Sequence, residues 1–349
     1  NTTIGGASQT LILESGSGIT VNTPTSGTPT HTIAANVGMA TNQTWSLGSG
    51  SALTISGVVG DFGAGNSLSK AGTGDLLLSG LNTYSGATVV EDGTLKIWHF
   101  SLGNSTVANA LGMSSASTAN LVLNPGTTLE FVISGDAAKP TDRGFTINGT
   151  ANGDSVTLEA ARSGGQGYRG VQLTSSACPG YGTPNQTRTL ILTGDQSSGG
   201  GNYNNNTRLH ANIADNGSGA VSLIKEGVGS WQLRGSCSFT GGSTINGGVL
   251  RMGRVNTLSS AGAVILADAS GATFVLDNYS QVIGSLSGGG GSGGNVTLGT
   301  ATLTAGDATS TTYAGVMSGT GSLVKQGAGK LTLSATHTYT GATTVNAGI

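Results

Sequence analysis

The stretch Ser322-Leu-Val-Lys-Gln-Gly-Ala-Gly-Lys-Leu-Thr-Leu333 opens a 28-residue frame that this chain of 349 residues carries three times. The three copies are free of gaps and span residues 67–94, 222–249 and 322–349. Eight positions are identical: a Ser-Leu pair, a lysine two residues later, two glycines, a leucine and two later glycines. Internal repeats of about this length are typical of solenoids, in which each unit buries its apolar face against a neighbour.

Apolar and polar residues alternate within each frame, which predicts β-strands. Leu331 and Leu333 alternate with Lys330 and Thr332, and a second strand is expected at 88–90, 243–245 and 343–345. The Gly-x-Gly before the first leucine predicts a tight turn, because glycine adopts positive φ without a steric cost. No long segment has helical spacing. Short strands with unequal spacers between the frames favour an all-β solenoid over a propeller, whose blades need a more uniform period.

The composition excludes several classes of protein. Glycine contributes 62 residues and charged residues only 9% of the chain, whereas disordered chains are rich in charge. The net charge of −2 gives no electrostatic reason to expect a nucleic-acid partner. No apolar run reaches the length of about 18–20 residues needed to span a membrane. The chain begins without a signal-peptide pattern and ends inside a frame, so we expect a processed or excised piece of a longer precursor.

The frames resemble the passenger-associated transport repeat, also called the autotransporter-associated β-strand repeat. The resemblance lies in residues 322–333 and in the segment from Tyr339 to Gly348; the spacer-like stretch from Ile283 to Leu298 extends it. The resemblance implies a right-handed parallel β-helix. It also implies an extracellular or cell-surface location in a bacterium, commonly as the passenger of a type V autotransporter.

The region from about 135 to 210 interrupts the pattern and is predicted to be an irregular excursion from a single solenoid domain of residues 1–349. Binding sites tend to lie on loops that leave a rigid scaffold, and arginine with tyrosine suits recognition of a glycan or a protein. The alternative is a solvated segment whose arginines only balance nearby acids. The candidates for partner binding in this region are Arg143, Arg162, Tyr168, Arg169, Tyr181, Arg188 and Tyr203.

Two further features have competing interpretations. Cys178 and Cys237 either form one disulfide, as is common in secreted proteins, or remain two unrelated thiols. The frame lysines have two interpretations: they form a charged row for a partner or, as we favour, they lie near exposed strand edges and discourage unwanted pairing between sheets. These lysines are Lys70, Lys225 and Lys325.

The sequence contains no recognisable catalytic, cofactor-binding or metal-binding motif. The four histidines are scattered, and the sixteen acidic residues are thinly spread. A polysaccharide-cleaving β-helix needs clustered carboxylates or a base on one face. We therefore predict a protein that is not an enzyme, with a polysaccharide-degrading enzyme as the least favoured alternative.

Two other functions remain. The first is a structural stalk or a head-to-tail fibre, because an unpaired end rung is a template for another chain. The second is an adhesin that binds a glycan or a host or neighbouring cell surface through the excursion. The residues predicted to form the assembly ends are Thr2, Thr3, Ile4, Thr344, Val345 and Ile349.

Overall fold

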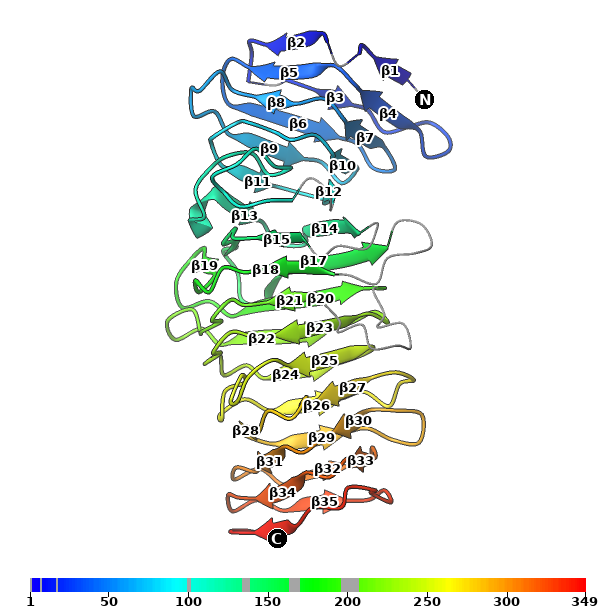
Figure 1. Ribbon diagram of the computed structural model, residues 1–349, viewed down its shortest axis with the longest axis vertical. Coiled ribbons are helices and arrows are strands. Elements are labelled where there is room, and N and C mark those ends of the chain that lie inside the picture. The colour runs from blue at the N-terminus through cyan, green and yellow to red at the C-terminus, as the bar shows by residue number, and fades with distance from the viewer. Residues whose placement is uncertain are drawn as a thin grey trace. The chain divides into compact units, whose positions relative to one another are not determined.

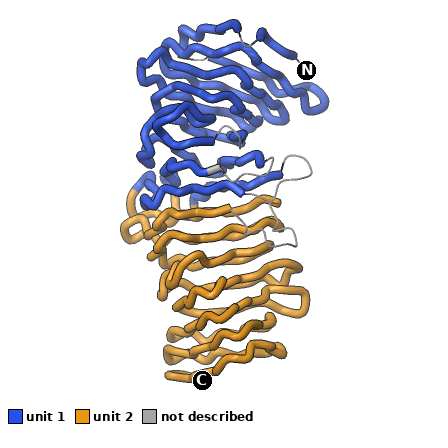
Figure 2. The backbone as a smooth tube through the Cα atoms, in the orientation of Figure 1, with its two compact units in different colours: residues 1–150, 154–183 blue, residues 151–153, 184–349 orange. Residues whose placement is uncertain are grey.

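The computed structural model describes residues 2–6, 8–16, 18–98, 102–133, 139–162, 170–195 and 207–349. These residues form short strands that pair in parallel with strands of the next rung, plus one 3-10 helix, η2, at Thr118–Asn120. They divide into two compact units, residues 1–150 with 154–183 and residues 151–153 with 184–349 (Figure 2). Within the described ranges, no helix is long and apolar enough to cross a membrane.

In unit 1, successive rungs contribute strands to ladders that follow the chain in order (Figure 1). The first ladder contains β1 (Thr2–Ile4), β4 (Thr30–Ile33), β7 (Ala52–Ile55), β10 (Asp75–Leu78), β12 (Thr94–Trp98), β14 (Thr128–Ile133) and β17 (Asp154–Arg162). The second contains β3 (Thr20–Val21), β6 (Gln43–Leu47), β9 (Leu68–Ala71), β11 (Thr88–Val90), β13 (Leu121–Leu123), β16 (Thr146–Ile147) and β19 (Gly180–Tyr181). The shorter ladders are β2 (Thr10–Leu13), β5 (Asn36–Met39) and β8 (Val59–Gly60), and the pair β15 (Lys139–Thr141) and β18 (Val171–Leu173).

Unit 2 has three ladders of the same kind (Figure 1). Face 1 consists of β20 (Arg188–Gly194), β22 (Val221–Lys225), β24 (Ser243–Ile245), β26 (Val264–Leu266), β29 (Leu286–Gly288), β32 (Thr311–Tyr313) and β35 (Leu331–Leu333). Face 2 consists of β21 (Arg208–Leu209), β23 (Ser230–Leu233), β25 (Val249–Met252), β27 (Thr273–Val275), β30 (Asn295–Thr297) and β33 (Met317–Ser318). Face 3 consists of β28 (Gln281–Ile283), β31 (Thr302–Ala305), β34 (Ser322–Lys325) and β36 (Thr343–Val345).

Stacks of apolar side chains fill the interior of each unit. On face 2, Trp231, Leu250 and Phe274 are in register on consecutive strands, and Val296 and Met317 continue the stack. All five side chains are buried. Because burying one large apolar side chain contributes about 1.5–3 kcal/mol, these stacks are the main source of stability. The all-β solenoid predicted from the alternation is confirmed, and so is the parallel strand pairing that the resemblance implies.

The repeat frame is slightly longer than one rung. Leu223 pairs with Ser243, and Leu323 pairs with Thr343, so each frame supplies a full turn and the start of the next. The same frame also occupies different faces of unit 2. The lysine-bearing strand lies on face 1 in the second frame (β22) and on face 3 in the third (β34). The repeated residues therefore build the rung itself and do not line up as one surface row.

The frame lysines are buried, so their interpretation as guards of exposed edges is wrong. Lys70, Lys225 and Lys325 are 1%, 0% and 4% exposed. The Nζ of Lys225 donates to the carbonyl oxygens of Glu226 and Gly227 in the adjoining turn and, at 3.1 Å, to that of Gly247 one rung further on. We call such a lysine with its three carbonyl acceptors a lysine cage.

The other two frames contain the same cage. Lys325 Nζ donates to the carbonyls of Gln326 (2.7 Å), Gly327 (2.8 Å) and Ala347 (3.1 Å), and Lys70 Nζ donates to those of Ala71, Gly72 and Asp92. Burial lowers the pKa of Lys70 and of Lys225 to about 8, so both remain ammonium ions at neutral pH. Each ammonium satisfies turn carbonyls of two successive rungs and joins their corners.

The last invariant glycine of the frame, Gly248 or Gly348, packs directly against the lysine cage. Gly248 has a φ of 58°, and a Cβ at this position would lie 2.3 Å from the oxygen of Gly229 and 2.8 Å from Lys225 Nζ. Gly348 has a φ of 72°, and a Cβ there would lie 2.7 Å from Lys325 Nζ. Only glycine fits, because both the backbone conformation and the space exclude a side chain.

The region from 135 to 210 is more regular than predicted. Its described part includes the nine-residue strand β17 and the seven-residue strand β20, whose side chains alternate between buried and half-buried. The prediction of an irregular excursion is therefore wrong for these segments, because Val156, Leu158, Leu190 and Leu192 supply the same buried stacks as the frames do. The single-domain assignment to residues 1–349 stays a prediction.

Candidate functional site

A polar groove of about 290 Å³ lies on the outer side of face 2 in unit 2. Its lining contains three arginines and one carboxylate, so the lining residues carry a net positive charge. The lining residues are Arg208, Gln232, Arg234, Arg251, Asp277, Asn278 and Tyr279.

Strand register brings the polar residues of the groove together. Arg208 on β21 pairs with Gln232 on β23, which pairs with Arg251 on β25. Their neighbours Leu233 and Met252 point into the core. Because successive side chains of a strand point to opposite sides, the three polar residues form an outward row across three rungs.

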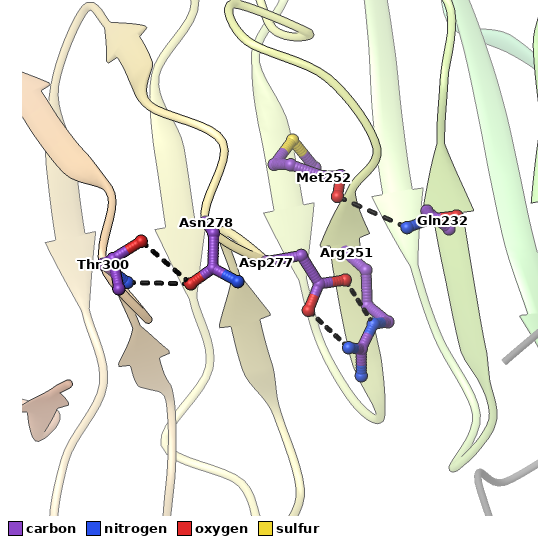
Figure 3. Close-up of polar contacts among 6 residues, drawn as sticks. All are labelled: Gln232, Arg251, Met252, Asp277, Asn278 and Thr300. Carbon is purple, nitrogen blue, oxygen red and sulfur yellow. Dashed lines mark hydrogen bonds and ion pairs between the residues drawn. The ribbon is translucent and has the colours of Figure 1, made fainter. Parts of the chain in front are cut away.

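One of the three arginines is already neutralised. Arg251 donates from Nε to Asp277 Oδ2 at 2.7 Å, and its Nη2 bonds the other carboxylate oxygen of Asp277 (Figure 3). Such a bidentate pair fixes both side chains. Beside it, Asn278 Oδ1 accepts hydrogen bonds from the backbone nitrogen and the hydroxyl of Thr300 (Figure 3).

The other two arginines have no such partner. Within the described ranges, neither Arg208 nor Arg234 forms an ion pair with a carboxylate, and the Nε atom of each is buried without a hydrogen bond. Burial lowers the pKa of Arg208, and the positive charge of Arg234 lowers it further. Arg208 nevertheless stays cationic, because arginine titrates far above neutral pH.

His210 lies beside these arginines. Burial lowers its pKa, and the charges of Arg234 and Arg208 add to the effect, so the ring is neutral at pH 7. Its Nε2 atom is buried without a hydrogen-bond partner. The neutral ring adds a polar atom near the groove without adding charge.

Gln232 lies between the arginines and is only 8% exposed. Its Nε2 is 3.4 Å from the carbonyl oxygen of Met252, while its Oε1 has no hydrogen-bond partner (Figure 3). An unsatisfied buried acceptor is costly, and such groups are uncommon in folded proteins. The groove therefore combines two unpaired cations with a free acceptor.

This arrangement is suited to binding rather than to catalysis. Unpaired guanidinium groups bind carboxylates, sulfates and phosphates through charged hydrogen bonds. The one carboxylate in the groove is held by Arg251 and is not available as a general base or nucleophile. The described residues contain no group of His, Cys, Asp and Glu side chains that could hold a metal ion.

Two of the predicted partner-binding arginines are structural. Arg143 and Arg188 are 1% and 0% exposed. Arg143 donates to carbonyl groups of residues 111–115, and Arg188 Nη1 donates to the carbonyls of Ala151 and Thr187, both at 2.8 Å. Because both guanidinium groups are enclosed by their own turns, the prediction that they contact a partner does not hold for these two.

The remaining predicted residues do not gather at one site. Arg162 ends β17 and Tyr181 ends β19; both are half-buried and lie in unit 1. Tyr168, Arg169 and Tyr203 lie outside the described residues. Partner binding by these five side chains stays a prediction.

Of the two interpretations of Cys178 and Cys237, the structure supports two separate thiols and not one disulfide. Cys178 is exposed, whereas Cys237 is buried 3.8 Å from the carbonyl oxygen of Ala211. Cys237 thus serves as a small core residue of its rung.

The predicted assembly ends are exposed. Thr2, Thr3 and Ile4 form β1, and the face 3 strand β36 includes Thr344 and Val345, with Ile349 four residues beyond Val345. Head-to-tail association through these residues stays a prediction.

Reasoning from sequence missed Gln232, Arg234 and Arg251, although a signal was present. Gln232 and Arg251 are both outward positions of predicted strands, and they lie 19 residues apart, which is close to one rung. The rung length was not known in advance, so their pairing could not be assigned.

Comparison with known proteins supports the repeat assignment. The family model for the passenger-associated-transport-repeat matches residues 68–97, 223–252 and 323–349. An adhesin autotransporter, BmaC, from Brucella suis biovar 1 (strain 1330) is 34% identical over 277 residues. The match covers 78% of this chain but only 6% of that adhesin. No solved structure matches the chain significantly.

The matched segments are the three frames, and the first two matches extend three residues beyond the frame into the next strand, so the family pattern coincides with the lysine cages. The matches indicate an extracellular or cell-surface location in a bacterium. The chain carries three passenger-associated-transport-repeats.

Proposed function

We propose that this chain is an adhesive section of a surface passenger, in which a rigid solenoid holds a binding groove in contact with external polymers. The observation that carries the proposal is the groove of unit 2, where, among the described residues, Arg208 and Arg234 have no carboxylate partner and Gln232 Oε1 has no hydrogen-bond donor. Regular strands hold these groups in place, so little conformational entropy is lost when a ligand binds.

The same groove favours a role that is not enzymatic. Its lining contains one carboxylate, on Asp277, and Arg251 holds it, whereas glycoside hydrolysis canonically uses a pair of carboxylates. The relative BmaC is described as an adhesin, which agrees with a binding role for the section that this chain shares with it.

The test is an attachment assay with beads that carry the whole chain. We expect several-fold more of these beads to remain on a layer of cultured epithelial cells than of beads carrying serum albumin at equal density. Equal attachment of the two kinds of bead would contradict an adhesive function and leave a stalk as the role of this section.

A further inference from the structure

We propose that the groove binds an anionic sugar unit of an acidic polysaccharide, with Arg208 and Arg234 holding the acidic group and Gln232 accepting a hydrogen bond from a sugar hydroxyl. The proposal rests on the adhesive function above and specifies its ligand. The anionic group is a sulfate or a carboxylate, which guanidinium groups bind with the same geometry.

The charge of the groove points to an anion. Arg208 and Arg234 repel each other and are partly removed from water, which makes the empty groove electrostatically unfavourable. The sequence from 196 to 206, which precedes the strand β21 that carries Arg208, contains no aspartate or glutamate. Among the described residues, the lining contributes only Asp277, which Arg251 already neutralises. An anionic ligand therefore supplies the negative charge that the described lining residues do not.

The space around Arg234 is built for its side chain. Position 253, one rung further on, is a glycine, and a Cβ there would lie 2.5 Å from Arg234 Cγ and 3.1 Å from its Nε. The Arg234 side chain thus lies across Gly253 toward the rung that carries Arg251. This placement sets the unpaired guanidinium in the groove instead of leaving it in bulk solvent.

The neutral groups point to a sugar. Gln232 Oε1 is a free acceptor on a side chain that is more than nine-tenths buried, and a simple anion offers it no hydrogen. A ligand that satisfies both this oxygen and the arginines needs a hydroxyl and an acidic group a few bonds apart, as in a uronate or a sulfated sugar. Tyr279 adds an aromatic surface to a groove whose volume suits one or two sugar rings.

The test measures binding of the folded chain to four probes by calorimetry at low salt. The probes are a heparin octasaccharide, a hyaluronan octasaccharide, neutral maltooctaose and polyglutamate. We expect binding to one or both acidic oligosaccharides and none to maltooctaose. Because heparin carries both sulfates and carboxylates and hyaluronan carries carboxylates only, binding to heparin alone identifies sulfate as the recognised group, and binding to hyaluronan shows that a carboxylate suffices.

The matched variants remove the same charge from different places. In the double variant Arg208→Gln with Arg234→Gln we expect affinity to fall at least about tenfold, the equivalent of about 1.4 kcal/mol. The control is Arg254→Gln with Lys330→Gln, which removes two exposed cations outside the groove. It should change affinity less than about twofold, and circular dichroism confirms that both variants are folded.

Three outcomes overturn the proposal: no binding to either acidic oligosaccharide, equal loss in the two double variants, or binding of polyglutamate with the same affinity as the sugars. The last identifies an acidic peptide as the ligand class instead. If beads attach to cells while both acidic oligosaccharides fail to bind, the adhesive function stands and only the proposed ligand is wrong.

Discussion

Lys225 and Arg234 belong to the same repeat frame and lie nine residues apart, yet their charges are used in opposite ways. Lys225 is fully buried, and its ammonium group has three backbone carbonyls as acceptors. Arg234 is half-buried and has no acceptor for its Nε. A buried cation with internal acceptors stabilises the fold, whereas one without them needs an external partner. The contrast separates the structural from the candidate binding residues of one frame.

The largest expected effect comes from removing a cage. In Lys225→Met the carbonyls of Glu226, Gly227 and Gly247 lose their donor inside the solenoid. We expect the free energy of unfolding to fall by about 3–5 kcal/mol, measured from urea unfolding curves. The matched control is Lys330→Met in the same unit, where the lysine is exposed and the loss should stay below about 0.5 kcal/mol. Equal losses would show that the cage contributes nothing particular.

The glycine that encloses the cage gives the next largest effect. In Gly248→Ala the new Cβ meets the oxygens of Gly229 and Gly227 at 2.3 and 2.5 Å, in a backbone conformation with φ 58°. We expect a loss of about 2–3 kcal/mol in urea unfolding. Gly271→Ala is the control, because its φ of 84° is equally left-handed but nothing lies within 4 Å. Its smaller loss, about 1 kcal/mol, isolates the backbone strain from the collision.

The strands and their inward faces were predictable from sequence, while the use of the charges was not. The alternation in residues 330–333 and the run at 343–345 correspond to the strands β35 and β36, and in the run at 243–245 (β24) buried and half-buried side chains alternate with a period of two. Lysine is rarely buried, so the position of Lys70 was assigned to the surface. Its acceptor on Asp92 becomes visible only when the rung register is known.

The groove was hidden for a related reason. Arg208, Gln232 and Arg251 come from three rungs, with spacings of 24 and 19 residues, so no fixed motif links them. By contrast, Arg143 and Arg188 lie in a region rich in arginine and tyrosine, which favoured a surface role. Composition alone cannot tell whether a guanidinium group faces its own turn or an open groove.

A smaller change in the free energy of unfolding is expected on acidification, through His337. His337 accepts a hydrogen bond at Nδ1 from the backbone nitrogen of Met317, at 3.1 Å, and its ring stacks on Tyr313 with centroids 6.0 Å apart. Burial lowers the pKa of His337, so the unfolded chain binds its proton first as the pH falls below about 6.5. The stability that the neutral ring of His337 contributes to the fold is therefore fully present above pH 6.5, and it is lost as the pH falls toward the lower pKa of the folded state.

The measurement is the difference in urea midpoint between pH 7.5 and pH 5.5. We expect His337→Asn to show a smaller difference than the parent chain, since an amide oxygen accepts the same hydrogen bond without titrating in this range. His210, whose pKa is also lowered, should account for part of the remaining difference. An unchanged difference in His337→Asn would mean that this ring does not respond to pH.

The smallest expected change in stability concerns Arg234, the groove arginine that was compared with Lys225. Arg234→Gln removes one of two neighbouring cations that lack ion pairs among the described residues, so we expect the free energy of unfolding to stay constant or to rise by up to about 0.5 kcal/mol. Arg251→Gln, in contrast, breaks the pair with Asp277 and should lose about 1 kcal/mol. If Arg234→Gln instead destabilises the chain as much as Arg251→Gln does, Arg234 supports the fold, and the distinction between the groove and the lysine cage fails.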